Sequence, residues 1–328
     1  MLFKESQQTP GLSDRSFQAA QILKKCEFCP NRCKVDRVSG ETGDCKAGLK
    51  VKIASVLAHH GEEPPVSGTR GSGTIFFSYC PLHCRFCQNF QISQLGQGYE
   101  VSEEELADLM LDLQVKGCHN INLVSPTQYL AQILSALEVA RKKGLILPVV
   151  YNTNGYETME MLKLLDGIID IYLPDIKYSS DAVATKLSGA RKYVEHNRRA
   201  LIEMHRQVGD LQCDSNGIAV RGLLVRHLVL PDDMAGSYES LKFLSENLGK
   251  EVHLSIMAQY HPCYKAGEDV EIGRRITASE YHRVLLWLEE FGLNNCFVQE
   301  LASSDIYLPD FEKQVVFRQE TEKEARHA

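Results

Sequence analysis

The chain has 328 residues, of which 44% are hydrophobic and 24% charged, so it can bury one large core and a small appendage. Its formal net charge of −7, with no basic run longer than Arg141–Lys143, disfavours a nucleic-acid partner, because phosphate binding needs a basic surface. We expect a cytoplasmic protein, since Met1–Ala20 lacks the apolar core of a secretory leader and no apolar stretch approaches the ~20 residues that span a bilayer.

Four cysteines follow a polar segment, residues 1–20, that reads as a frayed arm. They are spaced C-x2-C-x3-C-x11-C among turn-forming residues, at Cys26, Cys29, Cys33 and Cys45. Eleven cysteines in an expected cytoplasmic chain indicate metal or redox use rather than disulfides. Four thiolates suit zinc, which would staple a module too small for its own core, and they equally suit an iron–sulfur cluster. We expect residues 1–65 to form this arm and a metal-binding module.

A second group of cysteines follows a short apolar run, Ile75–Phe77, that predicts a buried strand. Its spacing is C-x3-C-x2-C, at Cys80, Cys84 and Cys87. Three thiolates on one loop can hold three corners of a cubic iron–sulfur cluster and leave the fourth iron open to a small molecule. No fourth ligand follows at a matching spacing, which disfavours a structural zinc loop.

Strand and helix patterns alternate along the rest of the chain. Strands are predicted at Val51–Leu57, Ile75–Phe77, Ile121–Val124, Ile146–Tyr151, Ile168–Leu173, Ala219–Leu230 and Val252–Met257, with a last extended segment at Cys296–Leu301. Helices are predicted at 102–117, 130–144, 158–165, 181–208, 241–248 and from 277, two of them opened by the capping boxes Ser102-x-x-Glu105 and Thr277-x-x-Glu280. The charged tail after Glu312 is expected to be mobile. Six β–α units in series predict a parallel α/β sheet with right-handed crossovers.

Polar residues gather where the predicted strands end, which is where parallel barrels collect their chemistry. Beyond the second cysteine group they are Ser125, Asn152, Thr153, Asp175, Lys177, Arg226 and His261. Arg226 and His227 must face opposite sides of their strand, so at most one of them points inward. A surface ion pair, which contributes little to stability, is the alternative for Asp175 and Lys177.

The second cysteine group, with Phe86 before its last cysteine, resembles the radical S-adenosylmethionine (SAM) superfamily. Further segments resemble the activating enzymes of glycyl-radical enzymes, pyruvate formate-lyase activase in particular: Thr153-Asn154-Gly155, Asp175-x-Lys177, Arg226-x2-Val229-x-Pro231 and Tyr260-His261. The resemblance covers about residues 74–265. It implies a partial (β/α)6 barrel over residues 66–302, a C-terminal tail at 303–328, and a 4Fe-4S cluster on Cys80, Cys84 and Cys87.

The same resemblance implies roles for the polar residues. Asn152, Thr153 and Asp175 would lie near the carboxylate of SAM, around a monovalent cation, although Asn152 replaces the family's aspartate and weakens that cation site. Lys177 and Arg226 would contact the methionine part, and Arg226 is the inward residue of its pair on this ground. His261 would lie near the nucleoside, and Phe86 and Ser125 would flank the adenine and the amino group. The family's Gly-Gly-Glu-like segment is replaced by Ser125-Pro126-Thr127.

The activity implied by the resemblance is that of an oxidoreductase. The cluster would cleave SAM reductively to a 5′-deoxyadenosyl radical, which would abstract hydrogen from a glycine of a partner glycyl-radical enzyme. The implied electron donor is a flavodoxin or ferredoxin. The cysteine module before the barrel departs from the activases, so another protein, a peptide, a small molecule or RNA is an alternative target. A non-catalytic iron–sulfur or zinc redox sensor is disfavoured, because a sensor would not need Asp175, Lys177 and Arg226.

Overall fold

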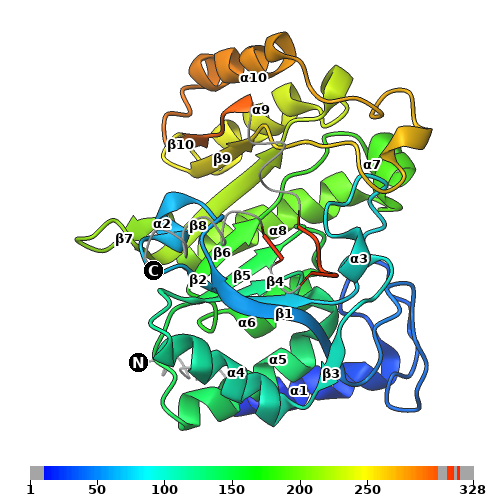
Figure 1. Cartoon of the computed structure of the whole chain (residues 1–328), viewed down its shortest axis with the longest axis vertical. Helices are drawn as coiled ribbons and strands as arrows, with labels where there is room; N and C mark the ends of the chain where they lie inside the picture. Colours follow the sequence, from blue (N-terminus) through cyan, green and yellow to red (C-terminus); the bar gives the residue numbers. More distant parts are fainter. Residues whose placement is uncertain (1–10, 302–308, 314–315, 318–328) are drawn as a thin grey trace, which may run out of the picture.

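The computed structural model describes residues 11–301, 309–313 and 316–317 (Figure 1). Its strands are β1 (Val51–His59), β2 (Ser72–Phe77), β3 (Tyr99–Val101), β4 (Ile121–Val124), β5 (Val149–Thr153), β6 (Ile171–Pro174), β7 (Gln212–Cys213), β8 (Ala219–Leu228), β9 (His253–Met257) and β10 (Cys296–Val298). Its α-helices are α1 (Leu12–Ile22), α2 (Pro64–Ser67), α3 (Phe90–Ser93), α4 (Glu103–Val115), α5 (Leu130–Lys142), α6 (Met159–Leu165), α7 (Asp181–Ser188), α8 (Tyr193–Val208), α9 (Ser237–Asn247) and α10 (Ala278–Phe291).

One sheet runs through the molecule in the order β10-β9-β8-β6-β5-β4-β2-β1-β3. Neighbouring strands pair in parallel from β10 through β9, β8, β6, β5 and β4 to β2. Beyond β2 the pairing is antiparallel, between β2 and β1 and between β1 and β3. In Figure 1, β9, β10 and α10 lie at the top, and α1, α4 and α5 lie at the bottom. The predicted α/β class with a parallel sheet is confirmed, and the arrangement agrees with a partial barrel.

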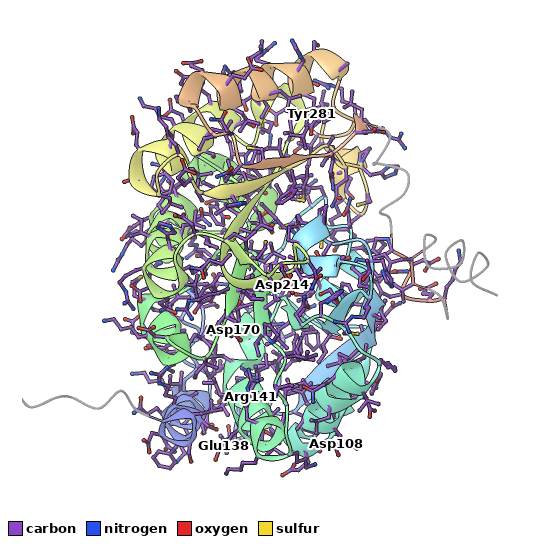
Figure 2. The ribbon with its side chains drawn as sticks, turned by 90° about the vertical axis from the view of Figure 1, so that its left-hand side faces the viewer. Asp108, Glu138, Arg141, Asp170, Asp214 and Tyr281 are labelled. Carbon is purple, nitrogen blue, oxygen red and sulfur yellow. The ribbon has the colours of Figure 1, made fainter. Side chains whose placement is uncertain are left out.

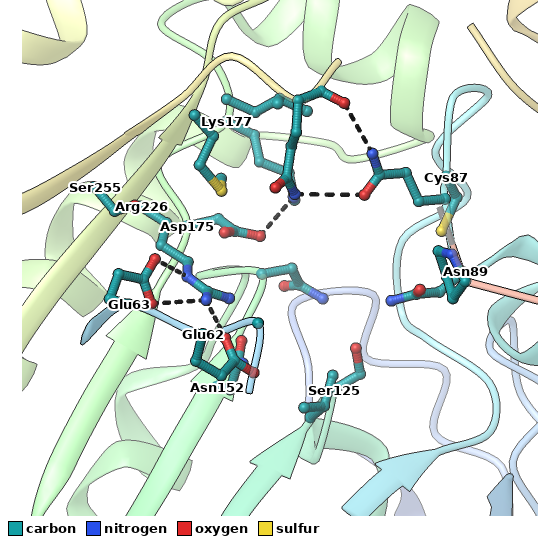
Figure 3. A pocket seen from close by; sticks show the side chains of 18 of the residues that line it. Glu62, Glu63, Cys87, Asn89, Ser125, Asn152, Asp175, Lys177, Arg226 and Ser255 are labelled. Carbon is teal, nitrogen blue, oxygen red and sulfur yellow. Dashed lines mark hydrogen bonds and ion pairs between the residues drawn. The ribbon is translucent and has the colours of Figure 1, made fainter. Parts of the chain in front are cut away.

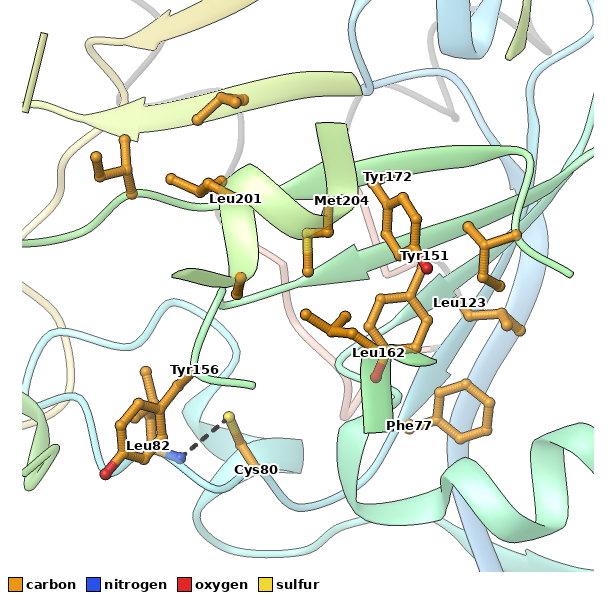
Figure 4. Packing of buried hydrophobic residues seen from close by; sticks show 14 of the residues in the cluster. Phe77, Cys80, Leu82, Leu123, Tyr151, Tyr156, Leu162, Tyr172, Leu201 and Met204 are labelled. Carbon is orange, nitrogen blue, oxygen red and sulfur yellow. Dashed lines mark hydrogen bonds between the residues drawn. The ribbon is translucent and has the colours of Figure 1, made fainter. Parts of the chain in front are cut away.

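Residues of the parallel strands alternate between two faces, as the pleat requires. Outward residues such as Tyr151 of β5 and Tyr172 of β6 pack with Leu162 of α6 and Met204 of α8 in the main hydrophobic core (Figure 4). The neighbouring Asn152 faces the other side and lines a cavity. Helices therefore cover the outer face of the strands, while the inner face is left for the site.

The two predicted capping boxes are present. Ser102 Oγ accepts from the Glu105 amide at 3.2 Å, and Glu105 Oε2 accepts from the Ser102 amide at 2.7 Å. Thr277 and Glu280 make the same pair of bonds at the start of α10. Tyr281 then fixes α10 to the sheet, because its hydroxyl donates to the carbonyl of Ile256 in β9 at 3.0 Å (Figure 2).

Two strands, β5 and β6, begin three residues later than the sequence predicted. β5 begins at Val149 rather than at Ile146, because Pro148 precedes it and Ile146 is 81% exposed, outside any regular element. β6 begins at Ile171, since the amide of Ile168 donates to the Leu165 carbonyl and closes a turn instead. Asp170 joins these strand starts to α5, with its carboxylate 3.8 Å from Arg141 (Figure 2).

The helical region predicted at 181–208 is two helices. α7 ends at Gly189, which adopts the left-handed conformation at φ 67° that glycine tolerates best, and α8 begins after Lys192. This break places the last turn of α7 against the second cysteine loop.

The N-terminal segment differs from the predicted frayed arm. Residues 1–10 lie outside the described part, but Leu12–Ile22 forms helix α1, so the prediction is wrong for residues 12–20. Ala19 and Leu23 give this stretch an apolar stripe that is buried in the main core. A short stripe in a polar sequence is a weak signal, because its partner, α5, comes more than a hundred residues later.

The predicted division at residues 65 and 302 stays a prediction, although β1, before residue 65, already pairs with β2. The tail predicted to be mobile falls mostly outside the described residues. Of its described residues, Phe317 is buried, with its ring centre 4.2 Å from that of His59. Within the described ranges, no helix combines the length and hydropathy that a bilayer crossing needs.

Candidate functional site

A cavity of about 720 Å³ lies on the inner face, at the carboxyl ends of the parallel strands (Figure 3). Residues at or near the ends of β2, β4, β5, β6, β8 and β9 line it, together with the segment that follows β1. Parallel α/β sheets place their ligand sites at this edge. The strand-end polar residues predicted from the sequence therefore converge, with two exceptions described below.

The second cysteine loop forms one wall of the cavity. Cys80 and Cys84 are each 8% exposed, and Cys87 is half-buried. The loop is fixed to the end of α7, because the amides of His83 and Arg85 donate to the carbonyls of Ser188 and Leu187 at 2.9 and 2.8 Å. All three cysteines line the same cavity.

Each of these three sulfurs has a polar partner from another element. Asn154 Nδ2 donates to Cys80 at 3.4 Å, and the Ser188 hydroxyl donates to Cys84 at 3.0 Å. The Ser93 hydroxyl lies 3.1 Å from the sulfur of Cys87. Donors of this kind stabilise the negative charge on metal-bound thiolates and tune their clusters.

Burial raises the pKa of all three thiols, that of Cys87 to about 12, so the free thiols carry their protons at neutral pH. Iron would have to displace these protons on binding. Among the described residues, no group of three or more His, Cys, Asp or Glu side chains is arranged to hold a single metal ion. Three hydrogen-bonded sulfurs at the rim of a cavity, two of them buried and one half-buried, fit a 4Fe-4S cluster with one open iron.

Asp175 and Lys177 form an ion pair in the cavity wall. Lys177 Nζ lies 2.5 Å from Asp175 Oδ2, and the side chains are 18% and 21% exposed, so the pair is not a surface one. Burial lowers the pKa of Lys177, but the carboxylate of Asp175 and the nearby Cys84 outweigh it and raise that pKa above its ordinary value. Asp175 thus has a cation of its own chain as its partner.

Arg226 points into the cavity, as predicted, while its neighbour His227 points outward and bonds to the Ile176 carbonyl at 2.8 Å. The guanidinium forms ion pairs with two carboxylates that were not predicted as site residues, Glu62 and Glu63 (Figure 3). Glu63 accepts two bonds of 2.8 Å from it. Burial raises the pKa of Glu63, but Arg226 outweighs it, and the net pKa is lowered.

Phe86, Ser125 and Asn152 line the cavity as predicted. Ser125 adopts a left-handed backbone at φ 56°, and its amide donates to the Asn152 carbonyl at 2.9 Å. Asn152 Nδ2 also contacts Glu62 at 3.4 Å. These residues link β4, β5 and the segment after β1 in one wall.

Thr153 is the first exception. Although it borders the cavity, its hydroxyl turns outward and donates to the buried Glu157 at 2.5 Å. Strand alternation explains this, because the preceding Asn152 takes the inward position. Its hydroxyl therefore does not face the place where SAM was expected.

His261 is the second exception, because it is not among the residues that line the cavity. Its ring lies 3.2 Å from the guanidinium of Arg275. Its neighbour Tyr260 is buried edge-on against Phe86, with ring centres 5.7 Å apart, and does not line the cavity either. The prediction that His261 lies near the nucleoside is therefore not supported by this geometry.

The four N-terminal cysteines lie close to one another. Asp44 N donates to the sulfur of Cys33 at 3.3 Å, and Cys26 exchanges backbone bonds with Lys34 and Val35, just after Cys33. Burial raises the pKa of Cys29, and Cys45, Cys33 and Cys26 raise it further. The metal that the sequence predicted for this group stays a prediction.

The sequence missed Glu62 and Glu63 and the donors to the cysteine sulfurs. Glu62 and Glu63 stand among turn residues, and nothing in the local sequence distinguishes them from acidic residues that are exposed. Ser188 lies in a helix far from any motif, and Ser93, six residues after Cys87, lies in a short helix that no sequence pattern singled out. Only Asn154, next to a predicted strand end, carried a usable signal.

Comparisons with known proteins find a family match for the stretch that carries Cys80, Cys84 and Cys87. Residues 74–224 match the sequence model of the radical SAM superfamily. An uncharacterized protein of Methanocaldococcus jannaschii is 32% identical over 296 residues, which cover 87% of this chain and 80% of that protein.

Several solved structures overlap partly with this chain. The SAM-bound SuiB of Streptococcus suis has 12% identity and a TM-score of 0.47, over 68% of this chain and 48% of its own. The FeFe-hydrogenase maturase HydG from Carboxydothermus hydrogenoformans has 13% identity and a TM-score of 0.47, over 73% and 60%. A radical SAM methyltransferase from Sphaerobacter thermophilus has 16% identity and a TM-score of 0.46, over 69% and 65%. The chain thus spans about half the length of SuiB. The match over residues 74–224 shows that the chain carries a radical SAM superfamily domain.

Proposed function

We propose that the chain holds a 4Fe-4S cluster on Cys80, Cys84 and Cys87 and binds SAM in the adjoining cavity. The observation that carries this proposal is the position of three cysteine sulfurs at one wall of a cavity whose other walls carry largely buried charged groups. When bound, the reduced cluster and SAM supply an electron transfer that yields methionine and a 5′-deoxyadenosyl radical.

The charged residues of the cavity suit SAM in number and sign. Apart from the exposed Glu300 at the β10 side, Asp175, Glu62 and Glu63 carry three formal negative charges, and Lys177 and Arg226 carry two positive ones, which leaves a net charge of −1. SAM carries a sulfonium, an ammonium and a carboxylate, and therefore a net charge of +1. Buried opposite charges of this kind favour binding because water screens them little.

Individual residues would orient the two halves of SAM. Lys177 presents a fixed ammonium to the carboxylate of the methionine part, and Asn152 offers an amide donor beside it. Phe86 and the backbone at Ser125 border the space for the adenine and the amino group. Arg226 is held by Glu62 and Glu63, so its role is to fix this wall and to contribute charge.

The hydrogen donor that we propose first is a backbone glycine of a glycyl-radical enzyme, with a flavodoxin or ferredoxin as the electron donor. The order of the segments around Asp175, Arg226 and Tyr260 supports it, because they stand as in pyruvate formate-lyase activase. The N-terminal cysteine module argues for a departure from that group.

A small molecule or short peptide is the second candidate, and the cavity itself favours it. The side next to β10 is lined by four further residues, Phe297, Glu300, Pro309 and Phe317. A protein would have to thread an extended loop past these residues. A compact substrate would not.

One experiment separates the two candidates. The anaerobically reconstituted protein is incubated with SAM and a reductant, either with a purified pyruvate formate-lyase or with a metabolite extract below 1 kDa. A glycyl-radical signal in electron paramagnetic resonance (EPR) supports the first candidate, and a rise of 5′-deoxyadenosine only with the extract supports the second. If 5′-deoxyadenosine forms in neither mixture nor in SAM alone, the proposed function is wrong.

A further inference from the structure

The four N-terminal cysteines are distributed unevenly along the chain. Cys26, Cys29 and Cys33 stand within eight residues, and eleven residues separate Cys33 from Cys45. Structural zinc sites usually draw their ligands as two short pairs, whereas 4Fe-4S sites in ferredoxins take three cysteines from one run and a fourth from elsewhere. The first three also mirror the density of Cys80, Cys84 and Cys87, which likewise stand within eight residues.

The fold brings the fourth cysteine back to the other three. Gly43 packs so closely on Cys33 that a Cβ atom there would lie 2.8 Å from its sulfur. This contact fixes the turn that leads into Cys45. Arg32, Lys34 and Lys46 all have positive φ angles, between 41° and 64°, so each cysteine segment turns tightly back on the others.

Backbone amides point at three of the four sulfurs. Asp44 N donates to Cys33 at 3.3 Å, and the amides of Asn31 and Ala47 donate to Cys29 and Cys45. Such N–H···S bonds to cysteine sulfurs are one of the ways in which proteins tune iron–sulfur clusters. As they stand, however, these cysteines form no group arranged around a single metal ion, which holds for every His, Cys, Asp and Glu side chain that the structure describes.

We infer that Cys26, Cys29, Cys33 and Cys45 hold a second iron–sulfur cluster rather than zinc. Unlike the first cluster, it would have four protein ligands and no iron open to SAM. This inference goes beyond the proposed function, which needs only the cluster on the second cysteine loop.

Two residues that stand between the N-terminal cysteines, Asn31 and Asp44, bond to the loop that carries Cys80, Cys84 and Cys87. Asn31 Nδ2 donates to the carbonyl of Pro81, the residue after Cys80, at 3.0 Å. Asp44 Oδ2 lies 2.8 Å from Nε2 of His83, the residue before Cys84, and accepts from Asn31 at 3.0 Å. A cluster on the four N-terminal cysteines would therefore fix Asn31 and Asp44 against the loop that carries Cys80, Cys84 and Cys87. Cys33 and Cys45 are only half-buried, so the second site also reaches the surface.

The test counts metals in three proteins after anaerobic reconstitution: the unchanged chain, a variant with Cys80, Cys84 and Cys87 changed to Ala, and a variant with the four N-terminal cysteines changed to Ala. The inference predicts about eight irons and no zinc in the unchanged chain. The first variant is expected to keep about four irons and four sulfides, with an EPR signal after reduction that SAM does not alter. The second variant is expected to hold at most half of the iron, because its loop loses support.

The inference is wrong if the first variant holds one zinc ion or no metal, or if the unchanged chain holds about four irons and one zinc. The count in the unchanged chain decides the matter even if a variant fails to fold, which circular dichroism would reveal. Failure of the proposed function gives a different result. In that case the variant without the four N-terminal cysteines holds no iron, while the variant without Cys80, Cys84 and Cys87 keeps about four irons.

Discussion

Arg226 of β8 donates two hydrogen bonds of 2.8 Å to the carboxylate of Glu63, a residue 163 positions earlier in the chain (Figure 3). The two side chains are only 15% and 6% exposed. Glu62 accepts from the same guanidinium and also from Asn122 Nδ2 at 2.9 Å. The segment after β1, outside the repeating β–α units, is thus bonded into the wall of the cavity.

Replacing Arg226 by Ala should lower the free energy of unfolding by about 3–5 kcal/mol, since two carboxylates would remain buried without their cation. Chemical denaturation of the metal-free chain at pH 7 measures this loss. A triple variant that also carries Glu62→Gln and Glu63→Gln should recover most of the stability. A loss below 1 kcal/mol in the single variant would show that the pair contributes no more than a surface one.

Glu157 should make stability depend on pH. Burial raises its pKa from 4.5 to about 7, although the hydroxyls of Thr153, Thr127 and Tyr151 lower it in part. The folded state therefore holds this proton more tightly than the unfolded state. Its contribution is complete below pH 4.5 and is lost as the pH rises to about 7.

The Glu157→Gln variant should remove this dependence. Between pH 5 and pH 8, the wild-type chain should lose about 2–3 kcal/mol more of its unfolding free energy than the variant does. Urea denaturation at the two pH values measures the difference. Equal losses in both proteins would mean that Glu157 titrates in the folded chain as it does in the unfolded one.

Replacing Lys177 by Ala should weaken SAM binding about 10- to 100-fold, because a charged hydrogen bond is lost and Asp175 is left to repel the carboxylate of SAM. The apparent KM for SAM in 5′-deoxyadenosine formation measures this effect. Lys186, an exposed lysine paired with Glu271, provides the matched control, and Lys186→Ala should leave KM unchanged. Equal KM values in both variants would remove Lys177 from the SAM site.

Replacing Ser188 by Ala should lower the reduction potential of the cluster on the second cysteine loop. The Ser188 hydroxyl donates to Cys84, and such a donor stabilises the more negative, reduced cluster. One hydrogen bond of about 1 kcal/mol corresponds to about 40 mV for one electron. Redox titration followed by EPR measures the shift. Tyr178→Phe, which removes the other partner of Ser188, is the control and should shift the potential less.

Much of the fold and part of the site could be predicted from local sequence. Cys80, Cys84 and Cys87 follow a short apolar strand, and Asp175 and Arg226 lie where strands end, so spacing and periodicity were enough to bring them together. Strand alternation also predicted that Arg226 and His227 face opposite sides of the sheet, so that assigning Arg226 inward placed His227 outward.

Other features depend on partners far away in the chain. Nothing near Glu62 and Glu63 indicates an arginine more than 160 residues later. His261 does not line the cavity, and its neighbour Tyr260 packs against Phe86, a tertiary contact that a dipeptide cannot reveal. Helix α1 was missed for the same reason, since its short apolar stripe has meaning only against α5.

The most direct test of the central claim is the amount of 5′-deoxyadenosine formed from SAM by the reconstituted, reduced chain and by its Cys84→Ala variant. Because the cluster needs all three cysteines of the loop, the unchanged chain should form 5′-deoxyadenosine and methionine in equal amounts, and the variant should form neither. Equal yields from both proteins, or no 5′-deoxyadenosine from an unchanged chain that is loaded with iron and sulfide, would contradict the claim.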